Sequence, residues 1–447
     1  MGRPLSIAGI ALTTVSAVVF LVVFFADLFG LHTNPYLGIL FFLILPAIFV
    51  FGLILIPLGA WFERRRRAAG KKPSELSWPR IDLNNPDHRR AAVAIFALTL
   101  VNIVIVSLAA YRGVEYMDSV QFCSQACHSV MKPEGVAHAD GPHARVACVA
   151  CHVGSGATSY VKAKWSGTRR LLAVSFNTYA RPIPSPRDLP SVRDTCEQCH
   201  WSATFHGDKV RRIVEYGDDE KNTESVTTLQ MHVGGPGRSG LASGIHWHAD
   251  AANEIDYIST DDKRDVIPYV RVKDRTGAVR EYVVEDVTPE QLAKGERRRM
   301  DCMDCHNRPS HQMAATAERA VDAAIARDAI PSDLPYIRRE AVKVLKAGYP
   351  TEDAAMAAIA KSLGDFYRGS PGGIYSTRRQ EVDTAVAGAQ QVYRRNVFPE
   401  MNVQFGTYPS NVGHIDFPGC FRCHDDNHAT KDGRKISQDC ETCHKIE

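Results

Sequence analysis

The twelve cysteines of this 447-residue chain form six close pairs, and a histidine directly follows the second cysteine of each pair. Five pairs have the spacing C-x-x-C-H, whereas the first has one additional residue between its cysteines. We number them as motifs 1 to 6: Cys123/Cys127/His128, Cys148/Cys151/His152, Cys196/Cys199/His200, Cys302/Cys305/His306, Cys420/Cys423/His424 and Cys440/Cys443/His444. This pattern is typical of covalent haem attachment, in which both thiols bind the porphyrin and the histidine ligates the iron. Zinc sites and disulfides also use paired cysteines, but neither needs a histidine at this position.

The motifs predict six c-type haems, which together use all twelve cysteines. Most haem irons take a second axial ligand, and eleven of the seventeen histidines lie outside the motifs. In the segment GIHWHAD, His246 and His248 are two residues apart and would share one face of an extended chain. We expect one of them opposite His306 of motif 4 and the other in a structural role. His414 and His428 flank motif 5 and are expected to ligate the last two haems, in either order.

Three apolar stretches precede the motifs, at residues 5–26, 36–61 and 91–111. Each is long enough to cross a bilayer, which takes roughly 20 residues. The loop between the second and third stretches carries nine Lys and Arg, so the positive-inside rule predicts that it is cytoplasmic. We therefore expect three spans in the cytoplasmic membrane, with the amino terminus inside. The motifs would then lie on the periplasmic or outer side, where haem is attached covalently.

The composition excludes other classes of protein. Hydrophobic residues make up 45% and charged residues 23% of the chain, which is typical of a folded protein. The formal net charge of +3 gives no indication of nucleic-acid binding. Residues 1–111 carry ten Lys and Arg against five Asp and Glu, so the positive charge is concentrated in the membrane part.

Regular structure is expected in two segments between the haem motifs. Residues 267–273 and 279–285 alternate in polarity around a turn at 274–277, which predicts a β-hairpin. The run from Thr288 to Gln291 has the pattern of a capping box with proline at the first helical position. Residues 313–395 have a helical pattern, with a helix start at Thr351 and a stop at Gly364.

These elements predict a mainly α fold. It combines three transmembrane helices with a multihaem cytochrome c domain that has little regular structure, a small β-hairpin insertion and a helical insertion. Six haems leave little room for an ordinary apolar core, so the porphyrins would take its place. The expected divisions are residues 1–90 (membrane hairpin and basic loop), 91–213 (third span, motifs 1 to 3), 214–312 (hairpin insertion, motif 4), 313–398 (helical segment) and 399–447 (motifs 5 and 6).

Residues 116–170 resemble the NapC/NirT/NrfH family of membrane-anchored multihaem cytochromes c. The resemblance rests on the run FCSQACHSVMKPEGVAHADGPHARVACVACHVGSGATSYVKAKWSG, in which motif 1 is followed by Met131, then His138 and His143, and then motif 2. It extends, with gaps, to motif 4, where CMDCHNRPSH places His311 five residues after the motif. The amino-terminal hairpin and motifs 5 and 6 are additional to the family pattern.

The resemblance implies a quinol dehydrogenase, which oxidises menaquinol or ubiquinol from the membrane quinone pool and passes the electrons to a periplasmic redox partner or reductase. It implies that Met131 ligates the first haem in place of His128, and that Lys164 contacts the quinol. It also implies two further pairs of ligands, His152 with His311 and His143 with His200. The family acid near the first haem is absent here, since the corresponding stretch reads Arg169, Arg170, Leu171.

Other functions remain open at this level. A catalytic multihaem reductase of a small oxyanion would need an iron with a free coordination position. A passive electron wire, fed by a partner membrane subunit, would differ from a quinol dehydrogenase only in lacking reactivity with quinol. The sequence sets neither the direction of electron flow nor the terminal acceptor.

Overall fold

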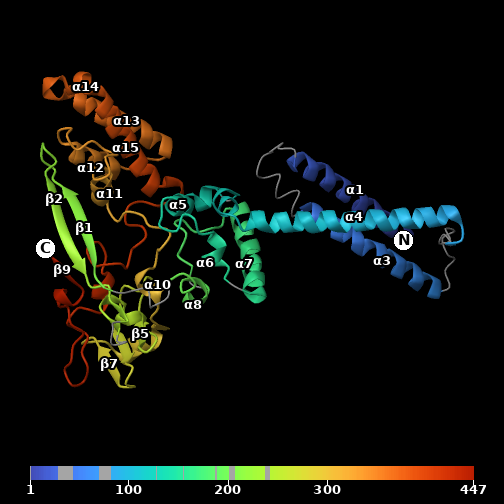
Figure 1. The fold of residues 1–447 in the computed structure, drawn as a ribbon, viewed down its shortest axis with the longest axis horizontal. Coiled ribbons are helices and arrows are strands. Elements are labelled where there is room, and N and C mark those ends of the chain that lie inside the picture. Colours follow the sequence, from blue (N-terminus) through green and yellow to red (C-terminus); the bar gives the residue numbers. More distant parts are fainter. Residues whose placement is uncertain are drawn as a thin grey trace. The chain divides into compact units, whose positions relative to one another are not determined.

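The computed structural model describes residues 2–28, 44–69, 82–126, 128–154, 156–186, 189–200, 207–236 and 242–446. The chain divides into two compact units, Met1–Ala126 and Cys127–Glu447 (Figure 1). We describe each unit by itself.

The first unit consists of three long helices: α1 (Gly2–Leu28), α3 (Leu45–Ala68) and α4 (Pro86–Met117). Glycines let α1 and α3 approach closely, since a Cβ atom on Gly9 would lie 2.7 Å from the carbonyl oxygen of Gly52. By length and hydropathy, the stretches Leu45–Arg66 and Thr99–Met117 can each cross a membrane. The described apolar part of α1, Leu5–Phe20, is shorter than that criterion requires. The start of the second expected span, residues 36–43, lies outside the described residues.

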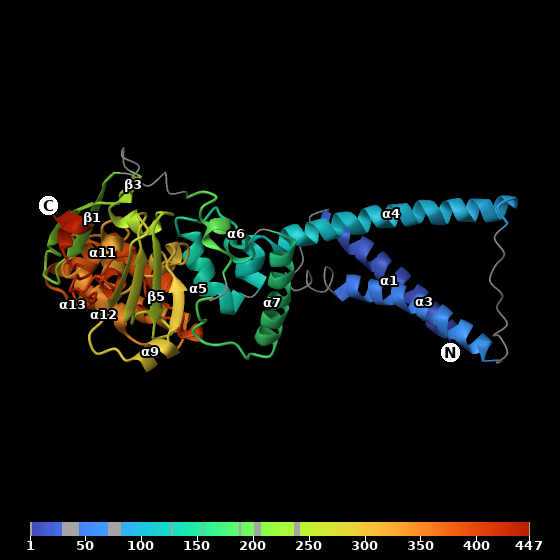
Figure 2. The ribbon, with the colours of Figure 1, turned by 90° about the horizontal axis from the view of Figure 1, so that it is seen from below.

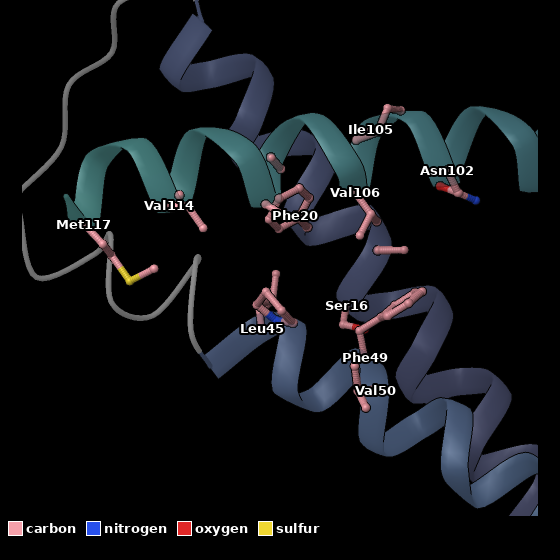
Figure 3. A pocket seen from close by; sticks show the side chains of 15 residues that line it. Ser16, Phe20, Leu45, Phe49, Val50, Asn102, Ile105, Val106, Val114 and Met117 are labelled. Atoms are coloured by element: carbon pink, nitrogen blue, oxygen red, sulfur yellow. The ribbon is translucent and has the colours of Figure 1, made fainter. Parts of the chain in front are cut away.

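A cavity of about 330 Å³ lies among these helices (Figure 3). Its lining comes from all three helices and is largely apolar, with Phe20 on α1, Phe49 on α3 and Val106 on α4. Ser16 and Asn102 add polar atoms, although the Ser16 hydroxyl already donates to the carbonyl oxygen of Leu12 at 2.6 Å. Helices α1 and α3 therefore form this cavity together with α4.

The second unit begins with helices that carry motif residues or lie between the motifs. They are α5 (His128–Ala139), α6 (Cys148–His152), α7 (Ala157–Ser175), α8 (Val192–Thr195) and α10 (Cys302–Cys305). The last two motifs form 3₁₀ turns at Gly419–Arg422 and Cys440–Thr442.

Antiparallel strands are more extensive than the sequence indicated (Figures 1 and 2). A four-stranded sheet has the order β7-β6-β5-β8, formed by β5 (Glu254–Ser259), β6 (Tyr269–Lys273), β7 (Val279–Val283) and β8 (Glu296–Arg299). A three-stranded sheet has the order β1-β2-β9, formed by β1 (Lys209–Tyr216), β2 (Glu224–Met231) and β9 (His444–Ile446). A third, two-stranded sheet pairs β3 (Gly235–Pro236) with β4 (Ala242–Ser243). The expected hairpin is present as β6 and β7, and it forms one half of the larger sheet.

Local capping signals agree with the structure. Helix α9 (Pro289–Lys294) begins with the predicted capping box: the Thr288 hydroxyl accepts from the Gln291 N–H, and the Gln291 side chain accepts from the Thr288 N–H. Helix α13 (Glu352–Gly369) begins at the predicted N-cap, Thr351. The predicted stop at Gly364 is wrong, because α13 continues through it. Gly364 lies on the buried face of this helix and does not adopt the positive φ of a terminating glycine.

The haem domain was expected to have little room for an ordinary apolar core, but the structure contains one. Helices α11 (Ala317–Ile325), α12 (Ile337–Lys346), α13, α14 (Ile374–Thr377) and α15 (Arg379–Asn396) form a helical segment with a conventional core (Figure 1). The buried side chains include Val321, Ile359 and Tyr393, and Tyr216 of β1 joins them. This segment therefore folds by ordinary apolar packing and supports the motif-bearing loops around it.

Candidate haem-binding sites

Motifs 2 to 5 each fold into a helical turn that presents the two cysteines and the histidine together, whereas in motif 6 the histidine begins strand β9. Motif 2 forms the helix α6. In motifs 3, 4 and 5 the histidine N–H donates to the carbonyl oxygen of the first cysteine, at 2.8, 2.7 and 3.0 Å. Residues i, i+3 and i+4 lie on the same face of such a turn. The spacing of the motif thus places two thiols and one imidazole on one side, as attachment to a single porphyrin requires.

The motif cysteines differ in how deeply they lie in the fold. Cys151, Cys199 and Cys440 are exposed, whereas the other described motif cysteines are half-buried. The turn of motif 3 is formed around the exposed Cys199, whose N–H donates to the carbonyl oxygen of Cys196 at 3.1 Å. Cys423, by contrast, packs against the apolar cluster of the four-stranded sheet. Haem attachment at Cys199 stays a prediction, and a thiol at the surface is accessible for it.

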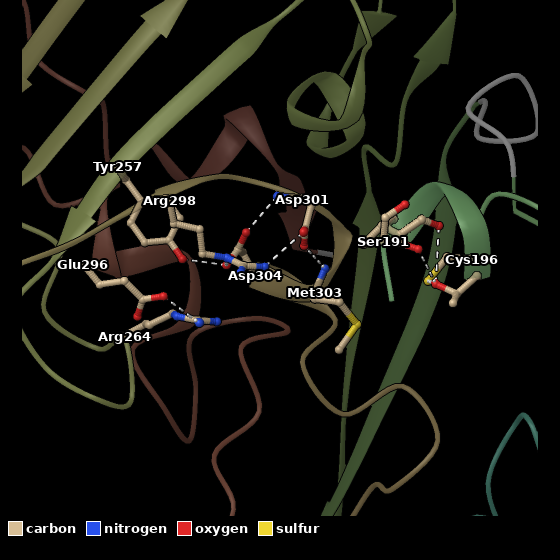
Figure 4. Close-up of polar contacts among 11 residues, drawn as sticks. Ser191, Cys196, Tyr257, Arg264, Glu296, Arg298, Asp301, Met303 and Asp304 are labelled. Atoms are coloured by element: carbon tan, nitrogen blue, oxygen red, sulfur yellow. Dashed lines mark hydrogen bonds and ion pairs between the residues drawn. The ribbon is translucent and has the colours of Figure 1, made fainter. Parts of the chain in front are cut away.

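A buried carboxylate anchors the turn of motif 4 (Figure 4). Asp304 is 2% exposed, and it accepts hydrogen bonds from the Tyr257 hydroxyl at 2.6 Å and from Nε of Arg298 at 3.0 Å. It also accepts from the N–H of Asp301 at 2.7 Å, while the Asp301 carboxylate accepts from the N–H of Met303. This reciprocal pair is a capping box. Sequence reasoning missed it, although the D-x-x-D spacing around Cys302 was a usable signal.

Motif 1 differs from the others in its backbone. Residues Phe122–Ala126 form a π-helix, whose turn holds more residues than an α-helical turn, and the additional residue of this motif falls within it. Cys127 and the His128 side chain lie outside the described residues. Met131 lies half-buried on α5, and Lys164 lies on α7, with its side chain outside the described residues.

The histidines of motifs 2 to 6 each lie beside a histidine from outside the motifs. The distances between ring centroids are 6.2 Å for His152–His311, 5.9 Å for His200–His143, 6.4 Å for His306–His246, 5.9 Å for His424–His248 and 6.1 Å for His444–His414. A bond from a histidine nitrogen to a metal is about 2.0–2.1 Å long, so two imidazoles on opposite sides of one ion have centroids roughly 6 Å apart. All five pairs have the spacing that a shared iron would need.

Hydrogen bonds fix the orientation of the partner rings. Nδ1 donates to a backbone carbonyl oxygen in His143 (3.2 Å), His246 (3.1 Å), His248 (2.8 Å) and His311 (3.1 Å). Metal-ligating histidines characteristically donate their second ring nitrogen in this way, which sets the tautomer and directs Nε2 to the metal. Burial also lowers the pKa of His248 and His311, which favours the neutral imidazole that binds metals.

His428 differs from these partners. Its ring is 1% exposed, Nδ1 lies 2.8 Å from the Asp425 carboxylate, and Nε2 lies 2.6 Å from the carbonyl oxygen of Ile267. Hydrogen bonds therefore occupy both ring nitrogens. The structure brings His248 to the histidine of motif 5, whereas the sequence analysis expected either His414 or His428 there.

His138 has a different environment again. Its ring centroid lies 6.3 Å from that of His311, but its Nε2 is 3.0 Å from the carbonyl oxygen of Val146 and its Nδ1 is buried without a hydrogen-bond partner. Among the described side chains, this histidine therefore lies next to the motif 2 pair.

The cysteines of consecutive motifs lie near one another. Burial, together with the nearby Cys196 of motif 3, raises the pKa of Cys302 to about 11. Burial likewise raises the pKa of Cys305 to about 11, with a contribution from Cys420 of motif 5. Besides burial, Cys196 of motif 3 raises the pKa of Cys151 in motif 2, and Cys420 of motif 5 raises the pKa of Cys443 in motif 6. Because such interactions weaken with distance, motifs 2 to 6 follow one another in space as they do in the sequence.

The described residues do not have the ligand set of a zinc site. No three His, Cys, Asp or Glu side chains in that part of the chain converge where a single ion could sit. A structural zinc ion takes four protein ligands, whereas haem iron takes four from the porphyrin and needs only two axial ones. Two histidines beside each pair of cysteines therefore fit haem iron and not zinc.

The paired imidazoles and the motif turns define a multihaem c-type cytochrome, and the apolar helices make it a membrane protein. The model of the NapC/NirT cytochrome c family, N-terminal region, matches residues 85–182. The chain is also 40% identical to the cytochrome c-type protein ImcH of Geobacter sulfurreducens, in an alignment that covers 99% of this chain and 88% of that protein. No solved structure matches. The chain belongs to the NapC/NirT family of membrane-anchored multihaem cytochromes, which function in electron transport.

Proposed function

We propose that this protein binds six haems and transfers electrons between the membrane quinone pool and an acceptor on the outer side of the membrane. The observation that carries the proposal is the set of five imidazole pairs, each with one motif histidine and ring centroids 5.9–6.4 Å apart. Haem iron supplies the one-electron chemistry when it is bound, and the protein supplies position and potential. Two histidines at an iron keep its potential lower than histidine with methionine.

The spatial order of the motifs supports a transfer path. Motifs 2 to 6 adjoin in sequence order, so the chain holds its binding turns in one continuous series. Motif 1 begins at the end of the membrane helix α4 and precedes this series in the sequence. Electrons from a quinol oxidised near motif 1 would thus pass through the second unit toward motifs 5 and 6.

Helix α7 has the surface expected next to a membrane. Val161, Trp165, Leu172 and Phe176 are all exposed, Trp165 by 73% and Phe176 by 72%. The spacing of four and seven residues places Val161, Trp165 and Leu172 on one face of the helix, and Phe176 is its C-cap residue. The helix also has four Lys and Arg and no Asp or Glu. An apolar stripe with an aromatic residue and adjacent cations is typical of a helix that lies in the lipid headgroup region.

This arrangement favours a quinol site beside α7. Lys164 belongs to this helix, and the family resemblance assigns its position to quinol contact. We propose that Lys164 binds the quinol headgroup and that Met131 ligates the iron of motif 1. Oxidation of the quinol releases two electrons, which leave singly, and two protons, which pass to water on the outer side. Menaquinol and ubiquinol both fit this chemistry.

We propose three spans with the amino terminus inside and the second unit on the periplasmic side. Two stretches of suitable length and the basic loop between the second and third apolar segments support this topology. The five paired histidines argue against catalysis on a small oxyanion at motifs 2 to 6, since both axial positions would be filled there. A periplasmic redox protein or reductase is the expected acceptor, and a partner membrane subunit would bind at the amino-terminal hairpin.

Anaerobic reduction by quinol tests the proposal. The protein in lipid nanodiscs is mixed with menaquinol or ubiquinol analogues, and the haem absorption bands are followed. Lys164→Ala should slow reduction at least tenfold, whereas Lys162→Ala, on the same helix, should change it little. Reduction by dithionite but by neither quinol would refute quinol oxidation and leave a wire fed by another protein. Equal slowing in both variants would refute the role of Lys164, and the cavity among α1, α3 and α4 would be the next site to examine.

A further inference from the structure

We propose that one 3₁₀ turn, Ile245–Ala249, supplies axial ligands to two haems at once: His246 to the haem of motif 4 and His248 to the haem of motif 5. The proposal rests on the proposed binding of six haems and extends it to the junction between the family part of the chain and its additional tail. It also assigns His428 a structural role.

The geometry of the turn explains how neighbouring histidines reach different partners. A 3₁₀-helix has three residues per turn, so consecutive side chains point about 120° apart. His246 lies beside His306 with ring planes 6° apart, and His248 lies beside His424 with planes 76° apart. Trp247, between them, packs into a third environment, the apolar cluster formed by Ile255, Tyr257, Ile267, Val270 and Val272. An extended strand would have placed both histidines on one side.

Backbone contacts hold the turn in this conformation. The N–H of His246 donates to the carbonyl oxygen of Val233 at 3.0 Å, and its Nδ1 donates to the same oxygen at 3.1 Å. The Asn253 side chain donates to the carbonyl oxygen of Trp247 at 2.9 Å. Gly244 precedes the turn with φ of +66°, and a Cβ atom there would collide with the carbonyl oxygen of His232. The two imidazoles are therefore pre-oriented by the fold.

Motifs 4 and 5 are joined independently of this turn. Arg422, within motif 5, is buried and donates through Nη2 to the carbonyl oxygen of Asp304, within motif 4, at 2.6 Å. Asn411 donates to the same carbonyl oxygen at 3.0 Å. The protein thus brings the two attachment turns together through its own hydrogen bonds. Because of this contact, His246 and His248 on one short turn can reach the histidines of both motifs.

His428 stabilises the tail instead of ligating iron. Its Nε2 donates to the carbonyl oxygen of Ile267, just ahead of β6, and its Nδ1 faces the Asp425 carboxylate. The next residue, Ala429, forms an antiparallel bridge with Val283 at the end of β7. His428 therefore fastens the motif 5 loop to the four-stranded sheet.

Electron paramagnetic resonance of the full oxidised protein tests the assignment. Nearly perpendicular imidazole planes give a low-spin haem a large-gmax signal, whereas nearly parallel planes give a rhombic one. Among the five described pairs, two are nearly perpendicular, at motif 3 (80°) and motif 5 (76°). His248→Met should remove one of two large-gmax signals and add the weak long-wavelength absorption band of a methionine–iron bond. His246→Met should instead remove a rhombic signal, and His428→Gln should remove none.

The outcomes separate this inference from the proposed function. Haem content is measured in each variant by the pyridine haemochrome assay, and attachment is measured by intact mass. Loss of a low-spin signal in His428→Gln, with both large-gmax signals kept in His248→Met, would overturn the inference at an unchanged count of six haems. Fewer than six haems in the unmodified protein would instead contradict the proposed function. His246→Met and His248→Met altering the same signal would also overturn the shared turn.

Discussion

The imidazole rings of His143 and His200 have centroids 5.9 Å apart and planes 80° apart, although 57 positions separate them in the sequence. The Nδ1 atom of His143 donates to the carbonyl oxygen of Pro309, which follows motif 4. Three distant segments thus meet at the attachment site of motif 3. The orientation of His143 depends on a residue more than 160 positions further along the chain, so the site forms only when the second unit is folded.

Removing His143 should open one iron. In His143→Ala the haem of motif 3 would lose its second ligand, change from low spin to high spin, and bind carbon monoxide when reduced. Paramagnetic resonance and a carbon monoxide difference spectrum measure the change, and quantification should find one additional reactive haem per protein. Arg145→Ala, an exposed position two residues away, is the control. The absence of a new carbon monoxide-binding haem would contradict the pairing of His143 with motif 3.

The buried carboxylate in motif 4 should be important for stability. Asp304→Ala would leave the Tyr257 hydroxyl and the Arg298 guanidinium without their shared acceptor. Because Arg298 keeps a second partner in Asp301 at 3.0 Å, the loss should cost about 1–3 kcal/mol, the usual penalty of a buried polar group left unsatisfied. Glu296→Gln removes a more exposed pair with Arg264, seen in Figure 4, and should cost less than about 1 kcal/mol. Thermal unfolding followed by circular dichroism compares the two, and equal shifts would refute the anchoring role of Asp304.

The four-stranded sheet should lose stability in acid. Hydrogen bonds from Arg299 and Lys273 lower the pKa of Glu254 below its ordinary value. A carboxyl group with a lowered folded pKa stabilises the fold fully above its unfolded value, near pH 4.3, and loses this contribution as the pH falls through the folded value. Glu254→Gln should therefore be less stable than the unmodified protein at pH 6, and the difference should shrink toward pH 3.

Midpoints of thermal unfolding at pH 6, 4 and 3 measure this dependence on pH. Glu285→Gln, at an exposed position just beyond β7, is the control and should follow the unmodified protein. A difference between Glu254→Gln and the unmodified protein that stays constant from pH 6 to pH 3 would rule out this contribution of Glu254.

Close helix packing makes Gly388 sensitive to substitution. A Cβ atom there would collide with the carbonyl oxygen of Ala329 and lie 2.7 Å from Cγ1 of Ile330. Gly388→Ala should therefore destabilise the helical segment by about 1–3 kcal/mol, the usual cost of overpacking. Gly348→Ala has no atom within 4 Å of its new methyl group and should have little effect. Haem content should be unchanged in both, and equal unfolding midpoints would show that the α15 contact tolerates a side chain.

Local spacing was enough to predict the attachment turns, because i, i+3 and i+4 positions share a face in any helical turn. The hairpin at β6 and β7 and the capping box at Thr288 followed from equally local patterns. Gly364 was misread because the same residue serves as a helix terminator or as a buried packing position, and only the neighbouring helices decide which.

The partner of motif 5 required information that local sequence does not contain. His428 is close to motif 5 in the chain, but its nitrogens are taken up by Asp425 and by the carbonyl oxygen of Ile267, 161 positions earlier. His248 reaches His424 because residues 245–249 form a 3₁₀ turn rather than a strand. The helical core was missed for a related reason: the motifs predict how many haems the domain binds, but not that residues 317–393 form an apolar core of their own.

The apolar stripe of α7 should control access of quinol. Trp165→Gln would place a polar side chain among the exposed apolar residues Val161 and Leu172, on the face that we propose to lie in the lipid headgroup region. The apparent KM for menaquinol in nanodiscs should rise several-fold, while the dithionite-reduced spectrum and the haem content stay unchanged. Val210→Gln, an apolar side chain of β1 with 71% exposure, is the matched control and should leave the KM unchanged. If both variants behave alike, the stripe does not contact the membrane, and the quinol must reach its site by another surface.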